Sequence, residues 1–367
     1  MSKPTQPARP TTPEQGAATG ARTPGMAIPA GREMPGSARL APPAWDNGRT
    51  SPPNGSAFHT IGQRNRKLEG LAKVTGRAVY ADDITLPRML HAKIKRSIHA
   101  HARLVAIDVS AALALPGVHA VVTGKDLPEY FGIIPWTQDE QALCEDKARY
   151  VGDAIACVAA DSELIAEEAL KRIKVTYEVL PAITSIDEAL AHPEIQVNEK
   201  ASEGNLSKHV RLEFGPVDEL LAASAVVVEA EYWYEGSTHG PIEPHCCVAE
   251  FDASGFLTVW SSTQVAHYLH RDLAKVLGLP TQRIRVIQPV VGGAFGGKSE
   301  PFSLEFCAAK LAMTTGRPVK ILYTREEVFY AHRGRHPMRL HYRTGIQADG
   351  TLTGTDARIH IDGGAYS

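Results

Sequence analysis

The sequence predicts an α+β protein with two mixed domains, and three observations support this fold class. Residues 89–177 alternate between strand-like apolar runs and helical periods. A strand pattern, a glycine-rich loop and a helical pattern follow one another over residues 283–316. A polar stretch over residues 186–210 separates these two regions and indicates a linker. We therefore expect one domain over residues 62–185 and a second over residues 211–367.

The first 58 residues are expected to be disordered. Residues 1–58 contain 11 of the 25 prolines of the chain, few large apolar residues and no repeating apolar period. Such a segment buries too little surface to offset its loss of conformational entropy. The sequence shows neither a secretory signal nor an apolar run long enough to span a membrane, so we expect a cytoplasmic protein.

The first domain is expected to alternate strands with helices. Apolar positions recur at helical spacing over residues 163–172, and Pro116 with Gly117 ends a shorter helix earlier in the chain. Strand patterns occur at residues 89–97, 103–109, 118–123, 150–159 and 174–177.

Composition and cysteine usage exclude several classes of site. The net charge of -2 argues against a nucleic-acid partner. The five cysteines show no C-x-x-C spacing, so zinc or iron–sulfur sites built by this chain alone are not expected, and neither are disulfides. The adjacent Cys246 and Cys247 are expected to be half-buried small residues on a strand rather than a redox pair.

The most informative stretch is the loop at residues 292–299, with the sequence GGAFGGKS. Glycine permits positive φ and lets the backbone approach a ligand, so such a run typically wraps one. The loop also fits the phosphate-binding pattern of nucleotide hydrolases, in which Lys298 and Ser299 would bind the phosphates and the metal. No convincing metal-holding Asp follows, and Pro301 would disturb the first turn of the helix. The loop alone therefore leaves open a nucleotide-hydrolase site, another ligand loop and a structural turn.

Further motifs recur in order from about residue 62 to the end of the chain. The first domain contains KVTGRA at 73–78, YAD at 80–82, PGVHAVVT at 116–123, YVGD at 150–153 and YEVLP at 177–181. The second contains HGPIEPH at 239–245, SSTQ at 261–264, the glycine loop, TGRP at 315–318 and RGRHP at 333–337. In order and spacing, these motifs resemble the molybdenum-binding subunits of the xanthine dehydrogenase and aldehyde oxidase family. The resemblance implies an α/β hammerhead domain followed by the first part of a mixed α/β molybdopterin-binding domain.

The resemblance also implies a cofactor and the residues that contact it. The glycine loop would wrap the dithiolene end of a molybdopterin, with or without a cytosine dinucleotide appendage. Gly293, Ala294, Phe295 and Gly296 would contact the pterin and the ligands of the metal, since exposed backbone N–H groups donate to anionic sulfur and oxygen. Gln264 matches the family glutamine whose side-chain amide donates toward a molybdenum oxo or hydroxo ligand. Its alternative is a hydrogen bond at the end of a sheet.

Three polar residues in the HGPIEPH motif belong to types that bind metals. His239, Glu243 and His245 are such a set, but prolines interrupt any helical presentation. Because the matching family segment is structural, we expect these residues to shape the cavity. Lys298 is expected to lie near an anion without acting as a phosphate-hydrolysis lysine.

Basic and histidine residues elsewhere have less specific expectations. Arg333, Arg335 and Arg339 form a cluster in sequence that would face an acidic substrate tail, a cofactor phosphate or carboxylates of the protein itself. His99 and His101 have no partner visible in the sequence, and we expect both to be surface residues.

Within the family, residues 298–306 and 323–337 most resemble the alpha subunit of 4-hydroxybenzoyl-CoA reductase. Ser299 stands where purine-oxidising members carry a glutamate that binds the substrate, which disfavours xanthine. Aromatic acyl-CoA thioesters, aldehydes and N-heterocycles remain as substrate classes.

The chain ends in what looks like a strand, about midway along such a subunit. Family members continue, and their later segment brings further pterin contacts and the general base, so no residue here is named as the base. The resemblance implies partner subunits that carry [2Fe-2S] centres and FAD. A non-catalytic fragment that only docks to the iron–sulfur subunit is a further alternative.

Overall fold

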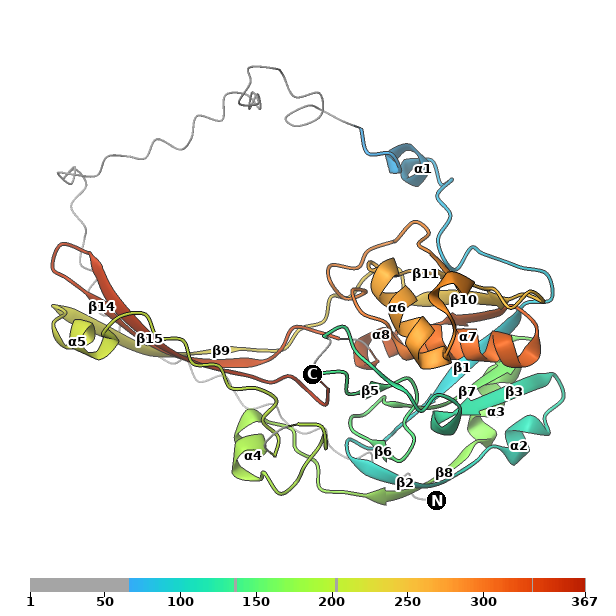
Figure 1. The fold of residues 1–367 in the computed structure, drawn as a ribbon, viewed down its shortest axis with the longest axis horizontal. Helices are drawn as coiled ribbons and strands as arrows, with labels where there is room; N and C mark the ends of the chain where they lie inside the picture. The colour runs from blue at the N-terminus through green and yellow to red at the C-terminus, as the bar shows by residue number, and fades with distance from the viewer. Residues whose placement is uncertain (1–65, 135–136, 202–203, 332, 367) are drawn as a thin grey trace, which may run out of the picture. The chain divides into compact units, whose positions relative to one another are not determined.

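A mixed sheet of seven strands lies at the centre of the fold, shown by a computed structural model of the chain (Figure 1). Residues 66–366 are described except 135–136, 202–203 and 332, and Leu68 onward forms one compact unit. The tail expected at residues 1–58 lies outside the described residues. In sheet order the strands are β12 (Ile284–Ile287), β11 (Leu257–Ser261), β10 (Cys246–Phe251), β13 (Val319–Leu322), β1 (Leu90–Arg96), β7 (Ala154–Ala160) and β3 (Val118–Thr123).

The sheet joins the two regions that the sequence separates. Strand β1 of the first region pairs in parallel with β13 of the second, and Leu90 aligns with Val319. The N–H of Leu90 donates to the carbonyl of Pro318 at 2.7 Å. Strands from both regions therefore share one hydrogen-bonded sheet and one apolar core.

Strand β7 is buried on both faces, and its small side chains explain why. Cys157 and Ala159 belong to the main core, in which α7 (Ser303–Thr315) covers the sheet. Ala156, Val158 and Ala160 face a second core built with α2 (Ser110–Leu113) and α3 (Glu163–Arg172). Small residues let helices approach closely on both sides.

Shorter helices and strands make up the rest of the described chain. The sheet β6-β2-β8 lies next to α2 and α3, and β4 pairs with β5 (Figure 1). Helix α6 packs on β12, and no helix in the described part of the chain is long and apolar enough to cross a membrane. These elements are α1 (Gly70–Val74), β2 (Ala102–Asp108), β4 (Tyr130–Phe131), β5 (Glu140–Gln141), β6 (Lys147–Ala148), β8 (Lys174–Val179), α4 (Ile186–Ala191), α5 (Val217–Ala222), α6 (Ala266–Leu277) and α8 (Glu327–Tyr330), with short 3-10 turns at Gly124–Asp126 and Thr281–Arg283.

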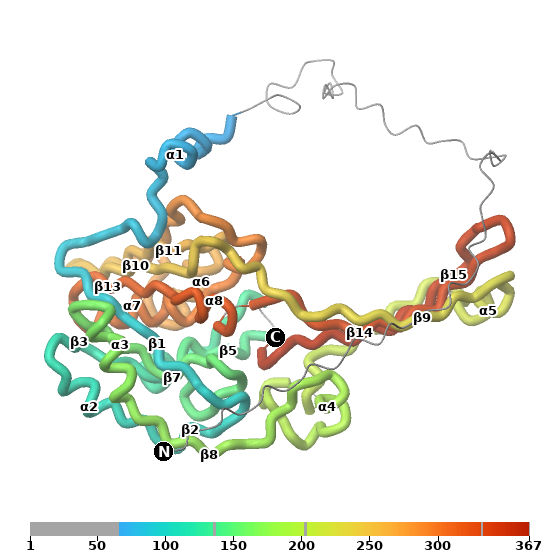
Figure 2. Tube along the Cα trace, turned by 180° about the vertical axis from the view of Figure 1, so that it is seen from behind, coloured from blue at the N-terminus to red at the C-terminus, as the bar shows by residue number. Residues whose placement is uncertain are grey.

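A separate three-stranded antiparallel sheet is formed by β9 (Val226–Tyr234), β14 (Met338–Ile346) and β15 (Leu352–Ile361). Strand β14 lies in the middle, and the three strands run side by side over their whole length (Figure 2). Most residues of the two outer strands are exposed. From the sequence, a strand was expected only near the last of these.

Several expected elements are confirmed, and one begins later than expected. Strand β3 and helix α3 have the predicted bounds, and β1, β2, β8, β12 and α7 lie where strands and a helix were predicted. The strand expected at residues 150–159 begins only at Ala154. Residues 150–153 form a turn instead, because Gly152 has φ +103° and Asp153 N–H donates to the Tyr150 carbonyl at 3.2 Å.

Two expectations about burial are wrong. Cys246 and Cys247 are both fully buried rather than half-buried, because β10 lies inside the sheet between β11 and β13. His101 is buried rather than exposed, and its Nδ1 lies 2.6 Å from the carbonyl oxygen of Pro181. Burial lowers the pKa of His101. His99 is half-buried and packs edge-on against Tyr177.

Candidate functional site

The glycine loop connects β12 to α7 and has an unusual backbone. Gly293 and Gly296 have φ of +106° and +96°, and Phe295 between them has φ +55°. Positive φ is rare for a phenylalanine and costs on the order of 1–3 kcal/mol. The side chain of Phe295 is 73% exposed, whereas Ala294 is buried. The loop is therefore held in a strained shape that presents an aromatic ring to its surroundings.

The segment that precedes β10 holds both ends of this loop. One carboxylate oxygen of Glu243, Oε2, accepts the N–H of Gly292 at 2.8 Å and the ammonium of Lys298 at 2.7 Å. His245 Nε2 lies 3.3 Å from the carbonyl oxygen of Gly297. Glu243 and His245 thus shape the loop, whereas the expected role of the HGPIEPH motif in shaping a cavity stays a prediction.

Gln264, just after β11, makes a second set of contacts with the loop. Its side-chain oxygen accepts the N–H of Gly296 at 3.1 Å and the N–H of Lys298 at 3.3 Å. Its own backbone N–H donates to the Lys298 carbonyl at 2.8 Å. The side-chain oxygen of this exposed residue is taken up by the loop, and its NH₂ group has no hydrogen-bond partner among the described residues.

The remaining donors of the loop fit an anionic ligand. Across the described residues, the N–H groups of Gly293, Ala294 and Phe295 have no hydrogen-bond partner. A Cβ at Gly296 would lie 3.4 Å from His239 Nε2, in a backbone conformation that side chains rarely adopt. Three successive free amides beside the NH₂ of Gln264 form the kind of donor set that binds sulfur and oxygen ligands carrying negative charge.

The nucleotide-hydrolase alternative does not fit this geometry. In a phosphate-binding loop the lysine reaches the phosphates, but Lys298 is only 1% exposed and is paired with Glu243. The anion that we expected near Lys298 is therefore a carboxylate of the protein. Ser299 donates its hydroxyl to the Gly296 carbonyl, and α7 begins four residues later, at Ser303.

Helix α7 is anchored behind the loop by a buried carboxyl group. Glu305 accepts the N–H of Phe302 at 2.9 Å and the hydroxyl of Ser261 at 2.8 Å. This side chain therefore ties the start of α7 to the end of β11, three residues before Gln264. Burial raises the pKa of Glu305 to about 7. Glu305 was not predicted from the sequence, although a glutamate two residues after the helix start is a capping signal.

The three arginines that we grouped from the sequence lie in different surroundings. Arg333 pairs with Glu140 and Glu300, and Arg339 pairs with Asp187 at 2.6 Å. Arg333 and Arg339 therefore satisfy the alternative in which carboxylates of the protein neutralise them. The backbone of Arg335 forms an isolated antiparallel β-bridge with that of Ser237.

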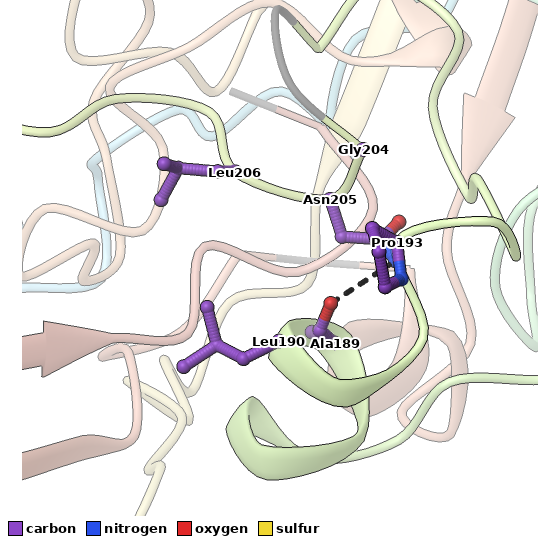
Figure 3. Close-up of a pocket in the computed structure, with 6 residues that line it drawn as sticks. All are labelled: Ala189, Leu190, Pro193, Gly204, Asn205 and Leu206. Carbon is purple, nitrogen blue, oxygen red and sulfur yellow. Dashed lines mark hydrogen bonds between the residues drawn. The ribbon is translucent and has the colours of Figure 1, made fainter.

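A hollow of about 360 Å³ lies elsewhere in the described part of the chain, away from this site. No ionisable side chain lines it, and the Asn205 amide donates to carbonyls including that of Ala189 (Figure 3). Such a hollow lacks the convergent polar groups of a reaction site. It is lined by Ala189, Leu190, Pro193, Gly204, Asn205 and Leu206.

Comparison with known proteins identifies the class to which this fold and site belong. A family model of the molybdopterin cofactor-binding domain matches residues 197–367. A model of the aldehyde oxidase and xanthine dehydrogenase a/b hammerhead domain matches residues 75–181. The fold is thus a hammerhead domain with a molybdopterin-binding domain of mixed α and β content.

Two relatives by sequence are named as subunits of dehydrogenases. The chain is 38% identical over 315 residues to the nicotinate dehydrogenase large molybdopterin subunit of Eubacterium barkeri, covering 85% of this chain and 73% of that one. It is 38% identical over 301 residues to a probable xanthine dehydrogenase subunit of Bacillus subtilis, covering 82% and 40%. The chain belongs to the molybdenum-binding subunits of the xanthine dehydrogenase and aldehyde oxidase family.

Solved structures of the same family share the fold. Quinoline 2-oxidoreductase from Pseudomonas putida 86 aligns with a TM-score of 0.76 and 33% identity, over 82% of this chain and 39% of that chain. Aldehyde oxidoreductase from Desulfovibrio gigas aligns with a TM-score of 0.74 and 29% identity, over 80% and 34%. The chain thus spans less than half the length of both of these chains.

Proposed function

We propose that this chain supplies part of the molybdopterin site of a molybdenum hydroxylase-type oxidoreductase. The observation that carries the proposal is a row of amides, at Gly293, Ala294 and Phe295, that have no hydrogen-bond partner in the described part of the chain and lie beside the side chain of Gln264. All of these donors belong to residues that the family resemblance implies as contacts of the cofactor. A bound molybdopterin would supply the two-electron redox chemistry.

In this proposal each loop residue has a stated role. Gly293, Ala294, Phe295 and Gly296 surround the pterin and the ligands of the metal, and Gln264 donates its NH₂ to an oxygen ligand of molybdenum. Fixed dipoles of this kind stabilise charge without reorganising during a reaction. None of these residues is assigned as the general base. We also propose that the cofactor carries a cytosine dinucleotide.

An N-heterocyclic aromatic compound is the substrate class that we propose. Phe295 offers an exposed ring at the loop, and aromatic rings stack on such surfaces. The hydroxyl of Ser299 is engaged with Gly296, and a serine cannot supply the charge with which a glutamate would bind a purine. Two of the relatives are named for nicotinate and quinoline, which are N-heterocycles.

A substrate panel separates this class from its alternatives. The protein complex, purified from its native host, is mixed with N-heterocycles, aldehydes or 4-hydroxybenzoyl-CoA, and an electron-carrying dye is followed by absorbance. We expect dye reduction with the N-heterocycles. Reductive loss of the ring hydroxyl from 4-hydroxybenzoyl-CoA with a reduced dye would instead support the acyl-CoA reductase, and aldehyde oxidation would support an aldehyde oxidase.

We also propose partner subunits and a compartment. Electrons leaving the molybdenum would pass to an iron–sulfur subunit with [2Fe-2S] centres and then to an FAD subunit, as the word subunit in the names of the relatives supports. All five cysteines are free and buried, which suits a reducing compartment such as the cytoplasm.

The role of Gln264 is tested by an isosteric change. Gln264→Glu keeps oxygens that accept the N–H groups of Gly296 and Lys298, but replaces the NH₂ by an oxygen that repels an anion. We expect pterin and molybdenum per chain to fall about tenfold, measured by pterin fluorescence and elemental analysis. The matched control is Gln282→Glu at an exposed position in the turn before β12, which should leave both contents unchanged. Unchanged contents in Gln264→Glu would refute the role.

A further inference from the structure

A single buried ion pair spans the glycine loop from one end to the other. Glu243 Oε2 contacts the backbone at Gly292, where the loop begins, and the side chain of Lys298, where it ends. Lys298 is 1% exposed, and burial lowers the pKa of its ammonium group. The carboxylate therefore bonds to the loop backbone at one end and is neutralised by the ammonium group at the other.

The segment that carries Glu243 is itself held in place. Arg325 donates from its guanidinium to the carbonyl of Pro241 at 2.7 Å and also to that of Ile242. Pro244 limits the backbone on the other side of Glu243 and offers its carbonyl to Lys298 at 3.5 Å. The backbone on both sides of Glu243 is therefore held in place.

The packing at Gly292 shows how closely the Glu243 side chain approaches the loop. A Cβ at Gly292 would lie 2.7 Å from the Cβ of Glu243 and 3.3 Å from the ring of Tyr80. The backbone of the loop therefore rests directly on the Glu243 side chain. Any side chain at position 292 would push the loop away.

We infer that Glu243 is a positioning residue for the cofactor loop and that Lys298 is its counter-ion. The carboxylate holds the backbone at Gly292, where the loop begins, and this contact sets the direction of the amides at residues 293–295, while Lys298 neutralises the carboxylate. Lys298 consequently binds neither phosphate nor substrate. The inference rests on the proposed function for its consequence in cofactor binding, but the positioning of the loop is a property of the chain itself.

A stabilising role without positioning is the alternative that has to be separated. Buried ion pairs contribute little net stability, and replacing both partners by neutral groups is often tolerated, whereas removing one partner leaves a buried charge. Single variants at Glu243 or Lys298 would therefore confuse loss of folding with loss of positioning. Paired variants avoid this problem.

The experiment compares Glu243→Gln/Lys298→Met with Glu243→Leu/Lys298→Met in the full chain, purified from its native host. Both variants remove the two charges together. Gln retains an oxygen that accepts the Gly292 N–H, whereas Leu, of similar size, has no acceptor. The readouts are amide hydrogen exchange over residues 290–299, pterin per chain, and the midpoint of thermal unfolding.

We expect the loop of the Leu variant to exchange about tenfold faster than that of the Gln variant, because the Gly292 bond is absent. Pterin per chain should fall about tenfold in the Leu variant only, while the two unfolding midpoints agree. Equal loop exchange in the two variants would overturn the inference, and so would faster exchange that accompanies a lower unfolding midpoint. If the wild-type chain holds no pterin, the proposed function fails, whereas the exchange comparison still tests the positioning role.

Discussion

At the scale of single residues, the site depends on backbone conformations that few side chains adopt. Gly293, Phe295 and Gly296 all have positive φ, and the strain at Phe295 persists because hydrogen bonds on both sides of the loop over-determine its shape. Glycine at 293 and 296 keeps the loop free of further strain. The conformation of the loop is therefore sensitive to a single methyl group added at Gly293 or Gly296.

Gly296→Ala tests this sensitivity. The added Cβ combines a φ of +96° with a contact of 3.4 Å to His239 Nε2, so we expect the loop to shift and the pterin content to fall about tenfold. The matched control is Gly278→Ala at the end of α6, where φ is +64° and no atom lies within 4 Å of the new Cβ. The control should lose about 1 kcal/mol of stability and retain its pterin. Equal pterin contents in both variants would contradict this account.

At the scale of elements, α7 and β11 are coupled through one buried carboxyl group. Glu305 bonds to the first turn of α7 and to Ser261 at the end of β11. The pKa of Glu305 is about 7 against an ordinary value of 4.5, because burial disfavours its charged form. A raised carboxyl pKa contributes stability below pH 4.5, and this contribution is lost as the pH rises through 7.

Glu305→Gln should therefore flatten the pH dependence of stability. The raised pKa corresponds to roughly 3 kcal/mol of unfolding free energy lost between about pH 4.5 and pH 8, and Gln retains groups that bond to Phe302 and Ser261. Denaturant unfolding at pH 5 and pH 8 measures the change. Glu140, whose pKa burial also raises to about 7, is present in both proteins, so their difference isolates Glu305. An equally steep loss of unfolding free energy in the variant would show that ionisation of Glu305 does not destabilise the fold. The control is Glu326→Gln, at an exposed site.

At the scale of the whole molecule, the sheet β9-β14-β15 has one apolar and one charged face. The strand register aligns Tyr232 with Leu340 and Leu340 with Ile359 on one face, while Glu231, His341 and Arg358 align on the other. Tyr232 is 55% exposed and Ile359 is 47% exposed. Large exposed apolar patches mark contact surfaces or aggregation sites. The apolar face comprises Val226, Val228, Tyr232, Tyr234, Met338, Leu340, Tyr342, Ile346, Ile359 and Ile361.

The purified chain should consequently self-associate through this face. Tyr232→Ser with Ile359→Ser removes apolar surface from the centre of the face, so we expect less association in sedimentation velocity at the same concentration. Glu231→Gln with Arg358→Gln changes the charged face and is the matched control, which should associate like the wild type. If the variant with serine at both positions associates as strongly as the wild type, the contact lies on another surface.

The local elements of the central region could be predicted because their patterns are local. The period of 163–172 and the alternation of 118–123 define α3 and β3 directly. The role of the loop and Gln264 at a cofactor was implied by the order of the motifs and stays a prediction. What could not be predicted depends on contacts between distant residues. Glu243 and Lys298 are 55 positions apart, and the pairing of Leu90 with Val319 spans the expected linker. Cys246 is fully buried for the same reason, since its neighbours in the sheet come from elsewhere in the chain.

The proposal that this loop and Gln264 hold a molybdopterin is tested by the metal and pterin content of the complex. Molybdenum and pterin per chain are determined in the complex purified from its native host through a tag on this chain. We expect about one molybdenum and one pterin per chain, the value for a single site. A value near zero, with other molybdenum enzymes of the same cells active, would contradict the proposal and leave a docking fragment as the better description.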